Sequence, residues 1–142
     1  MQVQIASSER NWAMAAHLSA LVAVAGLPFG HILGPLIVYL IKGHESEFVA
    51  AHARASLNYQ ITLSIAVIVA VIVGVAAMFG FIVPMHEASD TAAGLGFAGL
   101  WIALVLAALL VMLLSVIFII LGTIAASEGR PYSYPFAIRF LR

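Results

Sequence analysis

The sequence has no cysteine, so disulfides, thiolate metal ligands and cysteine nucleophiles are all excluded. Charge is also scarce, because Asp, Glu, Lys and Arg make up 8% of the chain, whereas a soluble domain has about a quarter. The formal net charge is zero, which removes the electrostatic attraction that nucleic-acid binding requires. The chain has neither a glycine-rich phosphate loop followed by lysine nor a G-x-S-x-G nucleophile turn. We therefore expect a protein that is not an enzyme, has no catalytic residues or cofactor, and binds no nucleic acid.

Apolar residues make up 64% of the 142 residues, more than one small soluble core can bury. They are concentrated in four stretches, and the last two exceed the roughly 20 residues that cross a hydrocarbon core. We expect a single all-α membrane domain over residues 1–142, an integral helical bundle of four membrane segments. The expected segments cover about 8–27, 29–42, 56–83 and 95–127, and an interfacial tail follows at 129–142.

The basic residues lie between or beyond the apolar stretches and predict the orientation of the chain. Lys and Arg next to a membrane segment are retained on the cytoplasmic side. A break at Gly26–Gly30 with Pro28 inside it lets the first two segments double back, which places all six basic residues on one face. The loop with Glu87 and Asp90 has no Lys or Arg and falls on the other face. The pattern predicts a multi-pass protein of the bacterial inner membrane with both termini cytoplasmic.

The second segment is short for a membrane helix. Its about 11 to 14 helical residues would span about 17–21 Å at a rise of 1.5 Å per residue. A shallow re-entrant hairpin would give the same placement of charges as two full crossings, so both arrangements stay open.

Small residues recur at helical spacing in three of the segments, which allows helix backbones to approach closely in lipid. Internal packing of one bundle explains these rows, and self-association or a membrane-protein partner in the bilayer is the alternative. The rows are Ala13, Ala16, Ala20 and Ala23; Ala66, Ala70 and Gly74; and Gly99, Ala103 and Ala107.

A polar cluster is expected near the cytoplasmic ends of the helices. If the helices start at similar depths, His17 lies level with Asn58, Tyr59, Gln60 and Thr62. An unpaired imidazole in hydrocarbon is costly, so this spacing predicts an interhelical hydrogen bond to His17. The alternative is a polar vestibule that contacts a ligand or a passing segment.

The segment His44–Glu47, together with His52, could suggest a metal site. The spacing matches no standard metal-ligand motif, so we expect a solvated loop and no bound metal. The same interpretation applies to His86, Glu87 and Asp90.

The tail interleaves aromatic and basic residues, a composition that is typical of membrane interfaces. It predicts an anchor along the cytoplasmic leaflet, and a docking strip for another protein is the alternative. The anchor residues are Arg130, Tyr132, Tyr134, Arg139, Phe140 and Arg142.

Four pieces of sequence carry a family resemblance: ERNWAMAAHLSA at 9–20, GPLIVY at 34–39, HARASLNYQ at 52–60 and YSYPFAIRF at 132–140. In these pieces the chain resembles a bacterial family of small integral membrane proteins of unknown function. That Tic20-like family is distantly related to a chloroplast inner-envelope import subunit. The resemblance implies a helical bundle with cytoplasmic termini and supplies no catalytic residues. We expect an accessory or assembly subunit of a larger membrane complex; a conduit or translocation component is the alternative.

Overall fold

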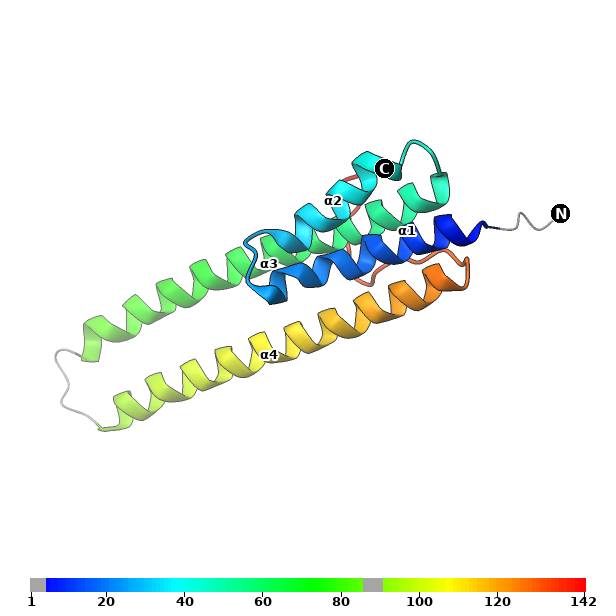
Figure 1. Ribbon diagram of the computed structural model, residues 1–142. Coiled ribbons are helices and arrows are strands. Elements are labelled where there is room, and N and C mark those ends of the chain that lie inside the picture. The colour runs from blue at the N-terminus through cyan, green and yellow to red at the C-terminus, as the bar shows by residue number, and fades with distance from the viewer. Residues whose placement is uncertain (1–4, 86–90) are drawn as a thin grey trace. The chain divides into compact units, whose positions relative to one another are not determined.

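The computed structural model describes residues 5–85 and 91–142, and its regular elements in these ranges are all helical. The all-α class is therefore confirmed, whereas the acidic loop around Glu87 and Asp90 lies outside the described residues. Figure 1 shows the helices. They are α1 (Ser7–Leu18), the 3-10 helix η1 (Ser19–Ala25), α2 (Gly30–Lys42), α3 (Glu47–Met85) and α4 (Thr91–Ser127).

The first apolar stretch forms two helical elements. α1 begins after Ala6, whose backbone N–H donates to Glu9 Oε2 at 3.0 Å, so a carboxylate satisfies a donor at the helix start. After Leu18 the helix tightens to 3-10 geometry as η1. The predicted break follows, with Gly26 at φ 88° and Phe29 at φ 58°, two left-handed residues that turn the chain before α2.

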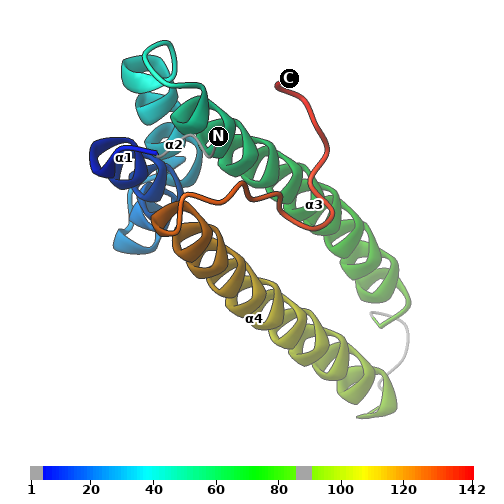
Figure 2. The ribbon, with the colours of Figure 1, turned by 90° about the vertical axis from the view of Figure 1, so that its right-hand side faces the viewer.

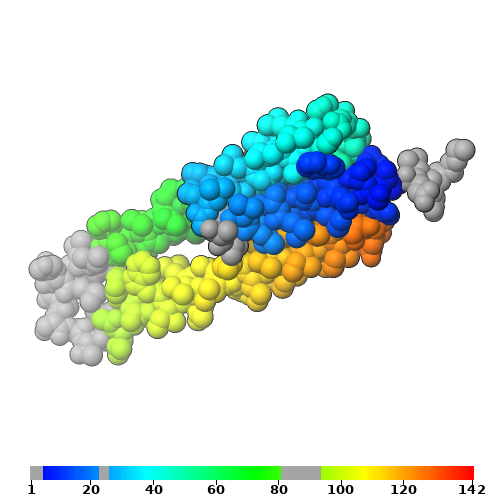
Figure 3. Space-filling view, viewed as in Figure 1, coloured from blue at the N-terminus to red at the C-terminus, as the bar shows by residue number. Residues whose placement is uncertain are grey.

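α2 packs against η1 with unusually close backbones. A Cβ added to Gly34 would lie 2.5 Å from the carbonyl oxygen of Ser19, so only glycine fits at this crossing. In the space-filling view the surface of α1 (dark blue) lies directly against that of α2 (cyan) (Figure 3). The first two segments thus form a helical hairpin.

α3 and α4, of 39 and 37 residues, are the long helices of the chain. Among the described residues two spans, Glu47–Gly80 and Gly94–Ser127, are long and apolar enough to cross a membrane, and α2 is a shorter apolar helix. A membrane helical bundle agrees with this composition, while four membrane segments and cytoplasmic termini stay predictions.

α3 begins at Glu47, earlier than the expected start at residue 56. An acidic residue in the first turn interacts favourably with the helix dipole. Four alanines between residues 47 and 55 add strong helix propensity. Local preference therefore extends α3 beyond its apolar run.

The chain forms two compact units, residues 1–64 with 115–142 (unit 1) and residues 65–114 (unit 2). Unit 1 contains two clusters of buried apolar side chains. One comprises Ala16, Val38, Val49 and Ala53, and the other Ala20, Tyr59, Ile119 and Tyr134. The second cluster joins η1, α3, α4 and the segment that follows α4.

Candidate functional site

Three buried side chains from distant parts of the sequence meet inside unit 1. His17 of α1 lies with Nδ1 2.8 Å from the hydroxyl of Tyr134 and with Nε2 2.8 Å from Nδ1 of His52 on α3. His52 Nε2 lies 3.1 Å from the carbonyl oxygen of Arg130, which follows α4. We call this chain of contacts, from Tyr134 to the Arg130 carbonyl, the His17 network.

The hydrogen bonds of the network all run in one direction when both rings are neutral. A carbonyl oxygen only accepts, so His52 Nε2–H donates to Arg130 and His52 Nδ1 is an acceptor. His17 Nε2–H therefore donates to His52, which leaves His17 Nδ1 to accept from the Tyr134 hydroxyl. Each ring thus has a fixed tautomer, assigned from its partners.

The network is tightly enclosed by protein. The exposed fractions of His17, His52 and Tyr134 are 0%, 1% and 5%. Burial raises the pKa of the Tyr134 phenol above its ordinary range, which keeps the hydroxyl protonated as the donor that the network requires. Removing one member would leave buried polar groups without partners, each at a cost of about 1–3 kcal/mol.

Aromatic rings and one glycine shape the space around His17. Tyr132 makes an edge contact with His17, with ring centroids 5.9 Å apart, and Phe48 packs on His52 at 4.6 Å. A Cβ at Gly122 of α4 would lie 3.0 Å from the His17 ring and 3.1 Å from Tyr132. Gly122 therefore provides the space that the imidazole occupies beside α4.

A second polar group holds the segment after α4, residues 130–142, which we call the strap. Asn58 Oδ1 accepts from the backbone N–H of Phe140 at 3.0 Å and of Leu141 at 2.8 Å, while Asn58 Nδ2 donates to the Leu141 carbonyl at 2.9 Å. Thr62 Oγ1 accepts from the Ile138 N–H at 2.9 Å. The strap therefore runs along the first part of α3 (Figure 2).

The predicted partners of His17 are all on α3 in unit 1, but the hydrogen bonds of the described residues join none of them to His17. Asn58 and Thr62 bind the strap, and the Tyr59 ring stacks on Tyr134 with centroids 4.4 Å apart. Gln60 is buried, and within the described chain its Nε2 has no hydrogen-bond partner.

Sequence reasoning missed His52 and Tyr134 as members of the network. The expected solvated loop is correct for exposed His44 and Glu45 but wrong for His52, because α3 begins at Glu47 and carries His52 into the interior. His52, Ser56 and Tyr59 share a helix face, which is the one signal that could have revealed the buried face.

The residues expected to form an interfacial anchor have different environments. Tyr134 is buried, Tyr132 is half-buried, and Arg130 is exposed with its Nε 2.6 Å from Glu128 Oε2. Arg139, Phe140 and Arg142 are exposed. Their contact with lipid stays a prediction.

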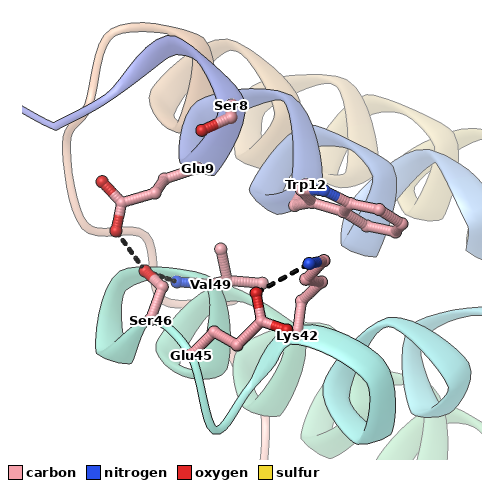
Figure 4. A pocket seen from close by; sticks show the side chains of 7 residues that line it. All are labelled: Ser8, Glu9, Trp12, Lys42, Glu45, Ser46 and Val49. Atoms are coloured by element: carbon pink, nitrogen blue, oxygen red, sulfur yellow. Dashed lines mark hydrogen bonds and ion pairs between the residues drawn. The ribbon is translucent and has the colours of Figure 1, made fainter.

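A small open pocket of about 130 Å³ lies between α1 and the turn before α3. The Lys42 ammonium lies 2.7 Å from the Glu45 carboxylate and 5.7 Å from the centre of the Trp12 ring. Figure 4 shows these side chains at the pocket. The hydrogen bond from Lys42 lowers the pKa of Glu45. Ser46 donates to Glu9 at 2.6 Å, so the pocket is lined by groups that already satisfy one another.

In the part of the chain that the structure describes, no three His, Asp or Glu side chains come together as a metal-binding group. The contacts that the structure does show at the site are directed hydrogen bonds between elements.

Comparison with known proteins gives one family. The sequence model of the magnetosome magnetite crystal formation protein family matches residues 8–141. Neither the curated proteins nor the solved structures contain a match.

Proposed function

Because the chain belongs to the magnetosome magnetite crystal formation protein family, we propose that it is a non-enzymatic integral membrane protein with an accessory role in crystal formation. At a finer level, we propose that it acts as an assembly subunit of a larger membrane complex. The observation that carries this proposal is the His17 network, in which the buried histidines connect α1, α3 and the strap.

The accessibility of these groups argues for a structural rather than a catalytic role. A general acid or base must reach the proton of a bound substrate within hydrogen-bond distance. His17 and His52 are enclosed by protein, and each ring nitrogen already has a partner. The network therefore supports a scaffold whose polar groups hold its elements together.

The surface of the long helices supports a membrane assembly role. α3 and α4 expose many large apolar side chains, which suit lipid or another membrane protein. Rows of small residues on both helices allow the close backbone approach that membrane helices use when they associate.

The proposal is tested by expressing the full chain in a magnetosome-forming bacterium that lacks its own members of the family. Electron microscopy should show magnetite crystals whose size and number are closer to those of the intact strain than are the crystals of the empty-vector strain. A variant with both His17 and His52 replaced by Leu, checked for membrane insertion, is the control for the network. Crystals that stay as defective as in the empty-vector strain would contradict the role in crystal formation.

Purification in mild detergent tests the assembly role. A membrane-protein partner recovered in constant ratio would support it, whereas an isolated chain that carries ions or solutes across liposomes would favour the conduit. The Tic20-like relation and the conduit have no separate supporting observation and stay predictions.

A further inference from the structure

Beyond the buried Tyr134, the strap is held through its backbone at Ile138, Phe140 and Leu141, which leaves the side chains of this part available for other contacts. Asn58 pairs with the backbone of Phe140 and Leu141 much as a neighbouring strand would, and Thr62 accepts from the N–H of Ile138. None of these bonds uses a strap side chain. The position of this part of the strap is thus fixed while several of its side chains are exposed.

Three of the outward side chains are large and apolar. The exposed fractions of Phe136, Ile138 and Phe140 are 93%, 56% and 47%. Such a cluster within five residues is unfavourable in water but suits an apolar environment. The exposed face of the strap therefore lacks a partner of apolar character within the described chain.

Phe136 also has an uncommon backbone conformation, with φ at 62°. The left-handed region is sparsely populated by aromatic residues, and such outliers persist where the surrounding structure imposes them. Here the left-handed residue is the most exposed aromatic side chain of the described chain. An unfavourable backbone conformation and a highly exposed apolar side chain therefore occur at the same residue.

The charge of the strap indicates the kind of partner. Between residues 131 and 142 the chain has Arg139 and Arg142 and no Asp or Glu, while Arg130 is already paired with Glu128. Both arginines are exposed and interleave with the apolar side chains. Arginine next to apolar side chains complements an anionic lipid headgroup above hydrocarbon.

The position of the strap along α3 agrees with this partner. Thr62, which binds Ile138, lies one helical turn before Ile65, where the unbroken run of exposed apolar residues begins. The point at which Thr62 binds the strap is therefore about 5 Å along the helix from the start of this exposed apolar run. The ends of membrane-spanning runs lie at the membrane interface, where Trp and Tyr are enriched and Lys and Arg flank the cytoplasmic side.

We propose that the strap is a binding surface for anionic phospholipids of the bilayer in which the chain resides. Phe136, Ile138 and Phe140 enter the boundary of the hydrocarbon, and Arg139 and Arg142 bind the headgroup phosphates. The docking by Asn58 and Thr62 holds these groups at the right depth. This inference does not depend on a role in crystal formation.

The test uses the full chain in lipid nanodiscs. Because the chain has no cysteine, Phe136→Cys gives one site for an environment-sensitive fluorophore. His44→Cys, in the exposed turn between α2 and α3, gives a matched site in unit 1. Each labelled protein is measured in phosphatidylcholine discs and in discs that also contain phosphatidylglycerol, with lipid-borne quenchers.

The fluorophore at position 136 should shift to shorter wavelength and be quenched by lipid in the anionic discs, and less so in the neutral discs. The fluorophore at position 44 should be unaffected. Adding Arg139→Gln and Arg142→Gln should weaken the partition of the strap into anionic lipid by roughly 30-fold. All four positions are exposed, and equal melting temperatures would show that the variants fold.

Equal emission at position 136 in neutral and anionic discs would overturn the proposal, as would an anionic response that the two Arg→Gln changes leave intact. A water-like signal in both discs that becomes apolar only with a purified membrane-protein partner would also overturn it, in favour of a protein docking strip.

Discussion

Unit 1 and unit 2 use opposite means of adopting a structure. Unit 1 buries His17, His52, Asn58 and Tyr134. Their hydrogen bonds connect residues that are 35 to 117 positions apart in the sequence. In unit 2, no side chain described in 65–80 or 94–114 is buried, and these ranges contain no Asp, Glu, Lys or Arg. In lipid, apolar burial no longer drives helices together, so specific polar contacts and close packing must do so. The contacts that specify this fold therefore reside in unit 1.

Replacing His17 with Leu should have the largest effect on this comparison. The change leaves the Tyr134 hydroxyl and His52 Nδ1 buried without partners, at about 1–3 kcal/mol each. We expect the free energy of unfolding to fall by about 2–6 kcal/mol, measured by thermal or denaturant unfolding in detergent. Leu106→Ala, at an exposed position of unit 2, is the control and should change little. Unchanged melting of His17→Leu would refute the role of the network.

Gly34→Ala should have the second largest effect. The added methyl group would lie 2.5 Å from the Ser19 carbonyl, so α2 must move away from η1. Overpacking of this kind costs about 1–3 kcal/mol, which the same unfolding measurement should detect. Gly80→Ala, which meets nothing within 4 Å, is the matched change outside unit 1. Equal stability of both variants would show that α2 can move away from η1 at little cost in free energy.

How far the sequence predicts this structure also differs between the two units. The helices of unit 2 follow from uninterrupted apolar runs, and the turn before α2 follows from the Gly26–Gly30 break, because both depend on local chemistry. The His17 network depends on the path of the strap, which returns along α3 and brings Tyr134 to His17. Sequence spacing carries no information on such a return. The apolar run begins later than α3 does, so the run alone does not predict that α3 starts at Glu47 and buries His52.

Asn58→Leu should loosen the strap while leaving the rest of unit 1 folded. The change removes three hydrogen bonds to the backbone of Phe140 and Leu141, each with a net value of about 0.5–1.5 kcal/mol. Amide hydrogen exchange at these two residues should accelerate roughly 10- to 1,000-fold, because exchange reports local opening and each 1.4 kcal/mol is about a factor of ten. Thr62→Val should accelerate exchange at Ile138 by a smaller factor, since it removes one bond to the strap. Protection unchanged at Phe140 and Leu141 would mean that the strap is held by its side chains.

The smallest effect is expected in unit 2, at Gly99 of α4. A Cβ there meets nothing within 4 Å, so Gly99→Ala adds no clash and reduces the backbone freedom of the unfolded chain. We expect the isolated chain to gain about 0.4–1 kcal/mol in stability, read from unfolding in detergent.

Gly99 shares a helix face with Ala103 and Ala107, so a partner that used this small-residue row would be displaced by a larger side chain. Gly99→Leu, followed by chemical crosslinking in membranes, distinguishes a row that packs within one bundle from a row that contacts a partner. Loss of a crosslinked species with Gly99→Leu would place the specificity of assembly in unit 2, so that specific contacts would not be confined to unit 1.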